Sequence, residues 1–271
     1  MNLVTTDWLN KNIDKVKIFD ASWHMPSSNR NSKKEYDEKH IKGAMFWDVD
    51  EHSDKDSPFP HMMSNSDYWT QMLSSFGIEN DDHIVVYDFS DTYSSCRLWF
   101  ALKYFGHMKV SVLDGGMKKW LSEKRPTVKE LDEIKSNLKS SYIVNENTEW
   151  IKDKKEIEEN IKTFSFQTVD ARNRERFEGK VDEPRPGLKR GCIPGSKNIP
   201  FKDCIDSETN TFKKKDELNK IFDENKVDVS KPIVFTCGSG MTACVLGMAY
   251  SIISGKNAVV YDGSWSEYGK I

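Results

Sequence analysis

The chain has 271 residues, of which 31% are charged, and its formal net charge is −3. Because both signs are mixed, this composition excludes the strongly basic surface expected of a nucleic-acid-binding protein. No apolar stretch approaches the roughly 20 residues of a membrane-spanning helix, and residues 1–20 lack the apolar core of a secretory signal. We therefore expect no membrane or nucleic-acid partner and a cytoplasmic location, or a mitochondrial one if a transit peptide is removed.

Cysteine and histidine are too sparse for a disulfide framework or a zinc site. The five cysteines include no Cys-x-x-Cys pair, which favours reduced thiols in a reducing compartment. The six histidines show no spacing with cysteine that is typical of zinc ligands. The sequence therefore predicts neither a metal site nor a cofactor.

The first half of the chain alternates short strand-like segments with a longer apolar one. A strand ending in Asp-Ala is predicted in KIFDAS, residues 17–22, and a glycine turn follows at Gly43. HIVVYD, residues 83–88, predicts a second strand, and residues 96–106 predict an apolar helix. Another strand and a glycine turn follow in VSVLDGG, residues 110–116. Such alternation is typical of an α/β domain around a mainly parallel sheet.

The second half repeats these signals in the same order. The matching segments are TVDAR (168–172), the turn at Gly195, PIVFTC (232–237), ACVLGMAYSII (243–253) and AVVYDGS (258–264). Self-similarity over half the chain predicts two domains of one fold. We place them at residues 1–125 and 146–271, joined by a charged connector at residues 126–145.

The halves differ where the second strand of each ends. Asp88 stands in the first half where Cys237 stands in the second, and the loop after Asp88 lacks glycine. Since an aspartate cannot act as a sulfur nucleophile, we expect a non-catalytic first domain that supplies one wall of an interdomain cleft. Ligands of open α/β sheets bind beyond the carboxyl ends of the strands, which is where Cys237 falls.

The loop CGSGMT, residues 237–242, combines a cysteine with two glycines between a strand and a helix. Such a loop can turn backbone N–H groups inward, and the helix adds its own N–H groups and positive dipole end. These groups stabilise an anion, which here can be the thiolate of Cys237. A lone buried cysteine is most often an inert apolar residue, but the glycine spacing favours a reactive nucleophile.

Over nearly its whole length the chain resembles the tandem-domain rhodanese (sulfurtransferase) family. CGSGMTAC resembles the active loop of the 3-mercaptopyruvate branch, whereas the thiosulfate branch typically has Arg and Lys where Gly238 and Ser239 stand. A cationic loop suits doubly charged thiosulfate, and a neutral loop suits a donor whose charge is bound elsewhere. The resemblance implies two rhodanese-like α/β domains, with the active site in the interdomain cleft.

The resemblance also implies a reaction. Cys237 would take sulfur from 3-mercaptopyruvate as a persulfide and release pyruvate, with Gly238, Gly240, Met241 and Thr242 lining the donor site. A thiol acceptor, such as thioredoxin or a small dithiol, or cyanide would then remove the sulfur. With a thiol acceptor, hydrogen sulfide can follow.

Two arginines of the segment DARNRERFEGKVDEPRPG match the family's donor-binding positions. The resemblance assigns Arg176 and Arg185 to the carboxylate and carbonyl oxygens of the donor, a role that suits the planar guanidinium fork. From the residues alone, surface ion pairs with the neighbouring Glu and Asp side chains are an equal alternative. For Arg172 and Arg174 we expect such surface pairs.

The family also implies a proton relay of Ser, His and Asp. Its members here would be Ser239, His61 and Asp50, with Asp54 as a competing position for the acid. From its polar surroundings, His61 could instead be an exposed loop histidine. The chain departs from the family pattern at Cys192, where a His usually precedes the Ile-Pro-Gly turn.

Three other functions compete with this one. Thiosulfate sulfurtransferase activity would use the same nucleophile. A cysteine phosphatase would need an Arg six residues after the Cys to bind phosphate, but Ala243 occupies that position. A low-turnover persulfide carrier or redox sensor would form the persulfide once, with Cys244 as a possible resolving thiol.

Overall fold

The computed structural model describes residues 1–129 and 141–271, which form two compact units. The first unit comprises Met1–Asp54, Ser64–Asn147 and Ser207–Thr211, and the second comprises Lys55–Met63, Thr148–Asp206 and Phe212–Ile271. The predicted division treats each domain as one continuous stretch, and two short segments depart from it. Residues 130–140 of the predicted connector lie outside the described residues.

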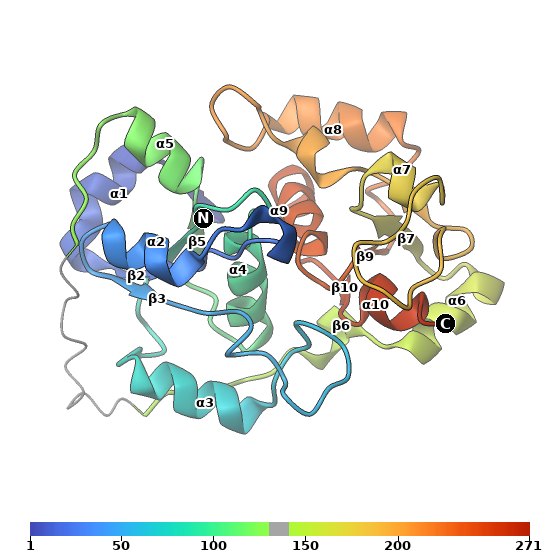
Figure 1. Cartoon of the computed structure of the whole chain (residues 1–271), viewed down its shortest axis with the longest axis horizontal. Helices are drawn as coiled ribbons and strands as arrows, with labels where there is room; N and C mark the ends of the chain where they lie inside the picture. The colour runs from blue at the N-terminus through green and yellow to red at the C-terminus, as the bar shows by residue number, and fades with distance from the viewer. Residues whose placement is uncertain (130–140) are drawn as a thin grey trace. The chain divides into compact units, whose positions relative to one another are not determined.

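The first unit is built on a five-stranded parallel sheet in the order β1-β5-β4-β2-β3. Its elements are β1 (Leu3–Val4), α1 (Thr6–Asn12), the 3₁₀ helix η1 (Ile13–Lys15), β2 (Lys17–Asp20), η2 (Pro26–Ser28), α2 (Ser32–Glu38), β3 (Ala44–Phe46), α3 (Ser66–Ser75), β4 (Ile84–Tyr87), α4 (Ser95–Tyr104), β5 (Val110–Leu113) and α5 (Gly116–Ser122). Figure 1 draws these elements from blue to green, with helices beside the sheet.

The second unit repeats this topology with the strand order β6-β10-β9-β7-β8, again all parallel. Its elements are η3 (Thr148–Trp150), β6 (Ile151–Lys152), α6 (Lys154–Thr163), β7 (Gln167–Asp170), α7 (Arg174–Phe177), β8 (Lys197–Asn198), η4 (Phe201–Cys204), α8 (Lys215–Glu224), β9 (Ile233–Thr236), α9 (Ala243–Ser254), β10 (Val260–Tyr261) and α10 (Ser264–Tyr268). The two sheets have identical connectivity, so the predicted fold class, two mainly parallel sheets flanked by helices, is confirmed.

Strand register shows which residues of the two halves are equivalent. Asp20 lies opposite the last residue of β4, and Asp170 lies opposite the last residue of β9. The next residues along the chain are Asp88 and Cys237, so both directly follow the central strand of their sheet. The register therefore confirms the equivalence that the repeated sequence predicts.

Helix α9 fixes the direction of the cysteine loop, because it is apolar on all sides and buried. It packs against β9, β10 and α8. It ends at Gly255, whose φ of 71° is the left-handed conformation that glycine adopts at a helix C-terminus. The loop before α9 is thus held between two buried elements, β9 and α9.

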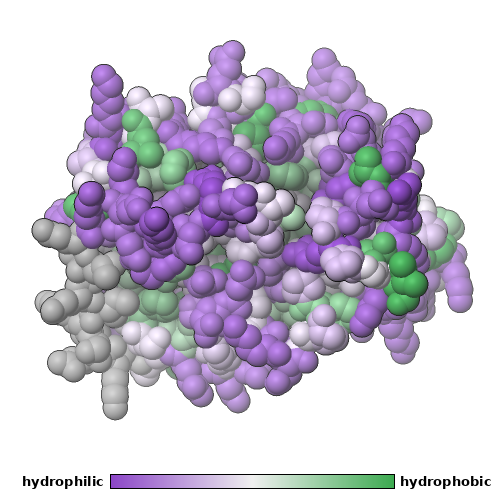
Figure 2. Space-filling view, viewed as in Figure 1, coloured by the Kyte–Doolittle hydropathy of each residue, from purple (hydrophilic) through white to green (hydrophobic). Residues whose placement is uncertain are grey.

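The surface reflects the high charged fraction of the sequence. On the face drawn in Figure 2, hydrophilic side chains predominate and hydrophobic ones form small, separate patches. Between residues 1 and 129 and from 141 onward, no helix is long and apolar enough to cross a membrane.

Candidate active site

The cysteine loop begins inside the second unit, and its first residue is buried. Cys237 is 2% exposed. Gly240 has a φ of 73°, a conformation that side chains other than glycine adopt with strain, so the turn requires glycine at this point. The backbone N–H groups of Cys237 and Gly240 donate to Oγ of Ser264, over 3.2 and 3.1 Å. These two N–H groups are therefore used within the protein. The expectation that the loop N–H groups stabilise a thiolate does not hold for these two.

Other backbone donors of the loop remain available. Within the described part of the chain, the N–H groups of Gly238, Ser239, Met241 and Thr242 donate to no protein group. The start of α9 lies directly after them and contributes the positive end of its dipole. These four N–H groups could thus donate hydrogen bonds to an anion bound at the loop.

The first turn of α10 fastens the loop from the other side. The carbonyl oxygen of Cys237 accepts from the N–H of Trp265 over 2.9 Å, and that of Gly238 accepts from the N–H of Ser266 over 2.9 Å. Sequence analysis missed Ser264, although the repeat contains a signal. Ser264 has a φ of 50°, and the equivalent position in the first half is a glycine, Gly116, with a φ of 54°. A serine kept in a conformation that favours glycine indicates that its hydroxyl is needed.

The structure joins two members of the predicted relay. Nδ1 of His61 lies 3.0 Å from Oγ of Ser239, and each residue is 5% exposed. The alternative of an exposed loop histidine is therefore wrong. Asp50 and Asp54 belong to the first unit, where Asp50 accepts a hydrogen bond from the indole N–H of Trp23 over 2.9 Å. The role of Asp50 in the relay stays a prediction.

The segment Lys55–Met63, which carries the relay histidine, is anchored within the second unit. The N–H of Met63 donates to Oδ2 of Asp262 over 2.8 Å. The ammonium group of Lys270 lies 5.5 Å from the ring centre of Phe59. These contacts fix a segment that is far from the cysteine loop in the sequence.

Both predicted donor-binding arginines lie against the loop. A Cβ atom at position 238 would come within 3.0 Å of Nη2 of Arg176 and 4.0 Å of Nη1 of Arg185. Glycine at this position therefore leaves space for the guanidinium group of Arg176, while Arg185 would be in ordinary van der Waals contact. Arg176 comes from α7, whose first turn is capped by Asn173 through a 3.0 Å bond to the Arg176 N–H.

A chain of buried ion pairs lies behind Arg176. Its Nη2 donates to Glu183 over 2.5 Å, and Nη1 of Arg172 donates to the same carboxylate over 2.8 Å. Arg172 also donates to Asp170 over 2.6 Å and lies 4.5 Å from the ring centre of Trp265. Burial lowers the pKa of Arg172, but the charges of Asp170 and Glu183 raise it by more.

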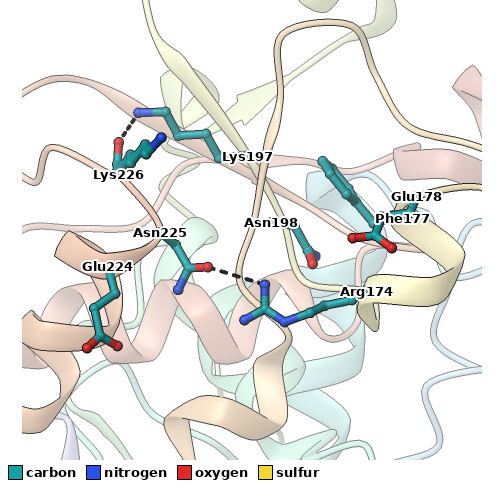
Figure 3. Close-up of a pocket in the computed structure, with 8 residues that line it drawn as sticks. All are labelled: Arg174, Phe177, Glu178, Lys197, Asn198, Glu224, Asn225 and Lys226. Atoms are coloured by element: carbon teal, nitrogen blue, oxygen red, sulfur yellow. Dashed lines mark hydrogen bonds between the residues drawn. The ribbon is translucent and has the colours of Figure 1, made fainter.

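These pairs correct one expectation and confirm another. Arg172 is 2% exposed, so its ion pairs are not the surface pairs that were predicted. Arg174 does form an exposed pair, with its Nη2 3.3 Å from Asp203. Its Nη1 donates to Asn225 over 3.5 Å across a pocket of about 300 Å³ (Figure 3). That pocket is lined by Arg174, Phe177, Glu178, Lys197, Asn198, Glu224, Asn225 and Lys226. It contains no residue of the cysteine loop.

The other cysteines of the second unit differ from Cys237 in their surroundings. Burial raises the pKa of Cys204 to about 12 and also raises the pKa of Cys192. Cys244 is buried, and its thiol donates to the carbonyl oxygen of Gly240 over 3.2 Å, which fits a packing role. Among the residues that the structure describes, no group of three His, Cys, Asp or Glu side chains could hold a metal ion.

Comparison with known proteins gives concordant matches. The family model of the rhodanese-like domain matches residues 5–123 and 153–270. The 3-mercaptopyruvate sulfurtransferase of Mus musculus is 42% identical over 263 residues, which cover 93% of this chain and 84% of that protein. The thiosulfate sulfurtransferase of Rattus norvegicus is 36% identical over 275 residues, covering 98% of this chain and 91% of that protein.

Solved structures agree with these matches. The Tum1 protein of Saccharomyces cerevisiae superposes with a TM-score of 0.90 at 29% identity, covering 99% of this chain and 94% of that one. SseA of Escherichia coli, described as a 3-mercaptopyruvate sulfotransferase, superposes with a TM-score of 0.86 at 34% identity. That match covers 98% of this chain and 99% of SseA.

Proposed function

Because the chain belongs to the family of rhodanese-like proteins, with one domain match in each half, we propose that it transfers sulfur from 3-mercaptopyruvate through a persulfide on Cys237. The observation that carries this proposal is the neutral loop beside two arginines. Gly238 and Ser239 add no charge next to the nucleophile, while Arg176 and Arg185 approach position 238 from outside the loop. The relatives named 3-mercaptopyruvate sulfurtransferase, such as the 42% identical mouse protein, support the same donor.

The arginines orient the donor. Each guanidinium offers a planar set of N–H donors that matches a carboxylate and the adjacent carbonyl oxygen. Binding these oxygens beside Gly238 would direct the donor's sulfur toward Cys237, which makes the reaction effectively intramolecular. Truncating either arginine should therefore raise the KM for mercaptopyruvate and slow the first chemical step.

The first stage moves one sulfur atom. The Cys237 thiolate attacks the sulfur of mercaptopyruvate, forming an S–S bond while the C–S bond breaks. The electron pair of that C–S bond leaves as the enolate of pyruvate, whose developing negative charge the arginines stabilise. The proton of the donor's thiol group ends on the enolate carbon, so pyruvate and a Cys237 persulfide result.

Ser239 and His61 are the groups proposed to carry that proton. Their 3.0 Å contact allows the hydroxyl and the imidazole to exchange a proton. Imidazole is the side chain most often used as a general acid or base, which fits this role for His61. Asp50 is the proposed third member, which would orient the imidazole.

In the second stage a thiolate acceptor, or cyanide, attacks the outer sulfur and Cys237 leaves as a thiolate. Thioredoxin or a small dithiol is the proposed acceptor, and a dithiol can release the sulfur as hydrogen sulfide by closing its own disulfide. The cytoplasm is the proposed location.

Thiosulfate is the second candidate donor, which is supported by the 36% identity with rat thiosulfate sulfurtransferase. The two activities are separated by kcat/KM for each donor, with pyruvate release measured over many turnovers in the presence of a dithiol. A higher value for mercaptopyruvate is expected. A higher value for thiosulfate would reassign the donor, and a single turnover with either donor would indicate a carrier.

A further inference from the structure

A buried carboxylate connects the donor-binding Arg176 to the interior of the second unit. The Glu183 side chain is 2% exposed, and it accepts from Nη2 of Arg176 over 2.5 Å and from Nη1 of Arg172 over 2.8 Å. Arg172 is itself held by Asp170, and both of their side chains are 1% exposed. Glu183 therefore bridges an immobilised guanidinium and a partly exposed one, since the Arg176 side chain is 21% exposed.

The hydrogen bonds of Glu183 determine which edge of Arg176 is free. Nε of Arg176 lies 3.2 Å from both carboxylate oxygens, so Glu183 occupies the edge formed by Nε and Nη2. Within the described residues, Nη1 of Arg176 has no acceptor. Nη2 also approaches position 238 of the loop. The edge formed by Nη1 and Nη2 is thus the one that remains for a ligand.

The backbone around Glu183 is restricted by the sequence EPRP. Pro184 follows Glu183, and Pro186 follows Arg185. A residue before proline is disfavoured in the helical conformation and adopts an extended one. The two prolines therefore restrict the backbone of the bend and turn at residues 184–187, next to Glu183.

The four charges of this network cancel. Arg172 and Arg176 are cations, and Asp170 and Glu183 are anions. Arg176 therefore offers directed N–H donors to the site while its charge is balanced by a buried carboxylate. A dianion gains more than a monoanion from each added unit of positive charge, because Coulomb energy scales with the product of the charges.

We propose that Glu183 is a positioning residue that also sets the preferred charge of the donor. It fixes the edge of Arg176 that binds the donor's carboxylate, and by cancelling one cation it favours singly charged mercaptopyruvate over doubly charged thiosulfate. This inference rests on the proposed function.

The test measures anion binding without sulfur transfer. Iodoacetamide alkylates Cys237, and the rate is followed with increasing pyruvate as the monoanion or sulfate as the dianion. In Glu183→Gln, half-protection by pyruvate should need about tenfold more ligand, the size of one charge-assisted hydrogen bond. The ratio of the sulfate concentration to the pyruvate concentration needed for half-protection should fall by roughly fivefold or more, because the network has gained one positive charge.

Asp182→Asn is the matched control. Asp182 is the preceding residue, and it pairs with Arg190 on the surface, with side chains 81% and 54% exposed. Loss of the Asp182 charge should change the half-protecting concentration of either anion by less than about twofold, as expected for an exposed pair. Glu183→Asp keeps the charge but shortens the side chain, so it should weaken pyruvate protection and leave the preference between the anions unchanged. This second variant also serves if Glu183→Gln does not fold.

Equal shifts for both anions in Glu183→Gln, or values like those of Asp182→Asn, would overturn the inference. Absence of protection by either anion in the wild type would overturn it as well. The same variants are then assayed with both donors, where the ratio of kcat/KM for thiosulfate to that for mercaptopyruvate should rise in Glu183→Gln. If the wild-type protein and its variants show the protection described above but the wild type turns over neither donor, the proposed function is rejected and the inference about Glu183 stands.

Discussion

The two halves of the chain place different side chains at one equivalent point of the same fold. In the first half, the Asp88 carboxylate accepts from the N–H and hydroxyl of Ser90 over 2.9 and 2.8 Å, and from the N–H of Ser95 at the start of α4 over 2.9 Å. In the second half the equivalent residue is Cys237, and the N–H of Ser239 donates to no group in residues 1–129 and 141–271. The first half thus shows that a strand, loop and helix of this kind stabilise an anion, and the second half offers the same place to a reactive sulfur.

A second contrast lies on the neighbouring strand. Asp20 and Asp170 each accept from the N–H of the residue two positions later, over 2.9 Å in both halves. That residue is Ser22 in the first half and Arg172 in the second. Burial raises the pKa of Asp20 to about 6, although the hydrogen bonds with Ser22 oppose the shift. Among the residues that the structure describes, an ion-pair network is thus built at this position in the second half and not in the first, and that network leads to Arg176.

The largest expected effect comes from replacing the side chain at each of these two equivalent positions. Cys237→Ser should reduce turnover by at least ~10³-fold, because a hydroxyl does not form the persulfide. Its thermal unfolding should stay near that of the wild type. Asp88→Asn should do the reverse, with activity retained and roughly 1–3 kcal/mol of stability lost through weakened bonds to the loop. Steady-state assays and denaturant titration check both, and substantial turnover by Cys237→Ser would contradict the account.

The paired aspartates should respond in opposite directions to loss of charge. Asp170→Asn leaves Arg172 buried with one partner fewer and should cost about 3–5 kcal/mol. Asp20→Asn should instead stabilise the protein at pH 7. The folded-state pKa of Asp20, about 6, lies above its ordinary value of 3.8, so its contribution to stability is present below pH 4 and is lost as pH rises through 6.

The pH dependence is the sharper test of this pair. The stability difference between Asp20→Asn and the wild type should grow by roughly 2 kcal/mol from pH 4 to pH 7 in urea titrations. A difference independent of pH would show that Asp20 is not a destabilising buried carboxyl group.

Ser264 tests whether a strained residue supports the cysteine loop. Ser264→Ala removes the acceptor of two loop N–H groups and keeps a side chain at a φ of 50°, so it should cost about 1–3 kcal/mol and slow turnover roughly tenfold or more. Ser264→Gly also removes the acceptor but matches Gly116 of the first half. It should be more stable than the alanine variant by about 1 kcal/mol yet equally slow. If the glycine variant had full activity, the hydroxyl would have no role at the loop.

The smallest effect is expected at Gly238. Gly238→Ala would place its Cβ 3.0 Å from Nη2 of Arg176, so the guanidinium must shift by a few tenths of an ångström. The KM for mercaptopyruvate should rise by roughly threefold to tenfold, with little change in stability. An unchanged KM would mean that Arg176 does not bind the donor at this edge of the loop.

Local patterns were enough to predict the elements and to single out Cys237, whose role as nucleophile stays a prediction. The Asp-Ala strands and the glycine turns recur in order, so the repeat and the two sheets follow from the sequence, and Cys237 follows from its strand–loop–helix context. The arginine side chains were ambiguous because a mixture of Arg and Glu predicts ion pairs without telling which are buried. Arg172 and Glu183 are distinguished from exposed pairs only by burial.

Long-range packing explains what local patterns could not predict. Only the family resemblance placed His61 with Ser239, and the two meet because the segment Lys55–Met63 joins the second unit, a contact across 178 positions. Ser264 was missed because its positive φ is visible only in the structure. Its alignment with Gly116 in the repeat was the available signal.

The central claim is that Cys237, and not its counterpart in the first half, carries the sulfur. The direct measurement is peptide mass spectrometry of the reduced protein after brief exposure to 3-mercaptopyruvate or thiosulfate, with pyruvate assayed in parallel. The account predicts one added sulfur on the Cys237 peptide, formed faster from mercaptopyruvate, and repeated pyruvate release once a dithiol is added. No added sulfur on Cys237 from either donor would contradict it.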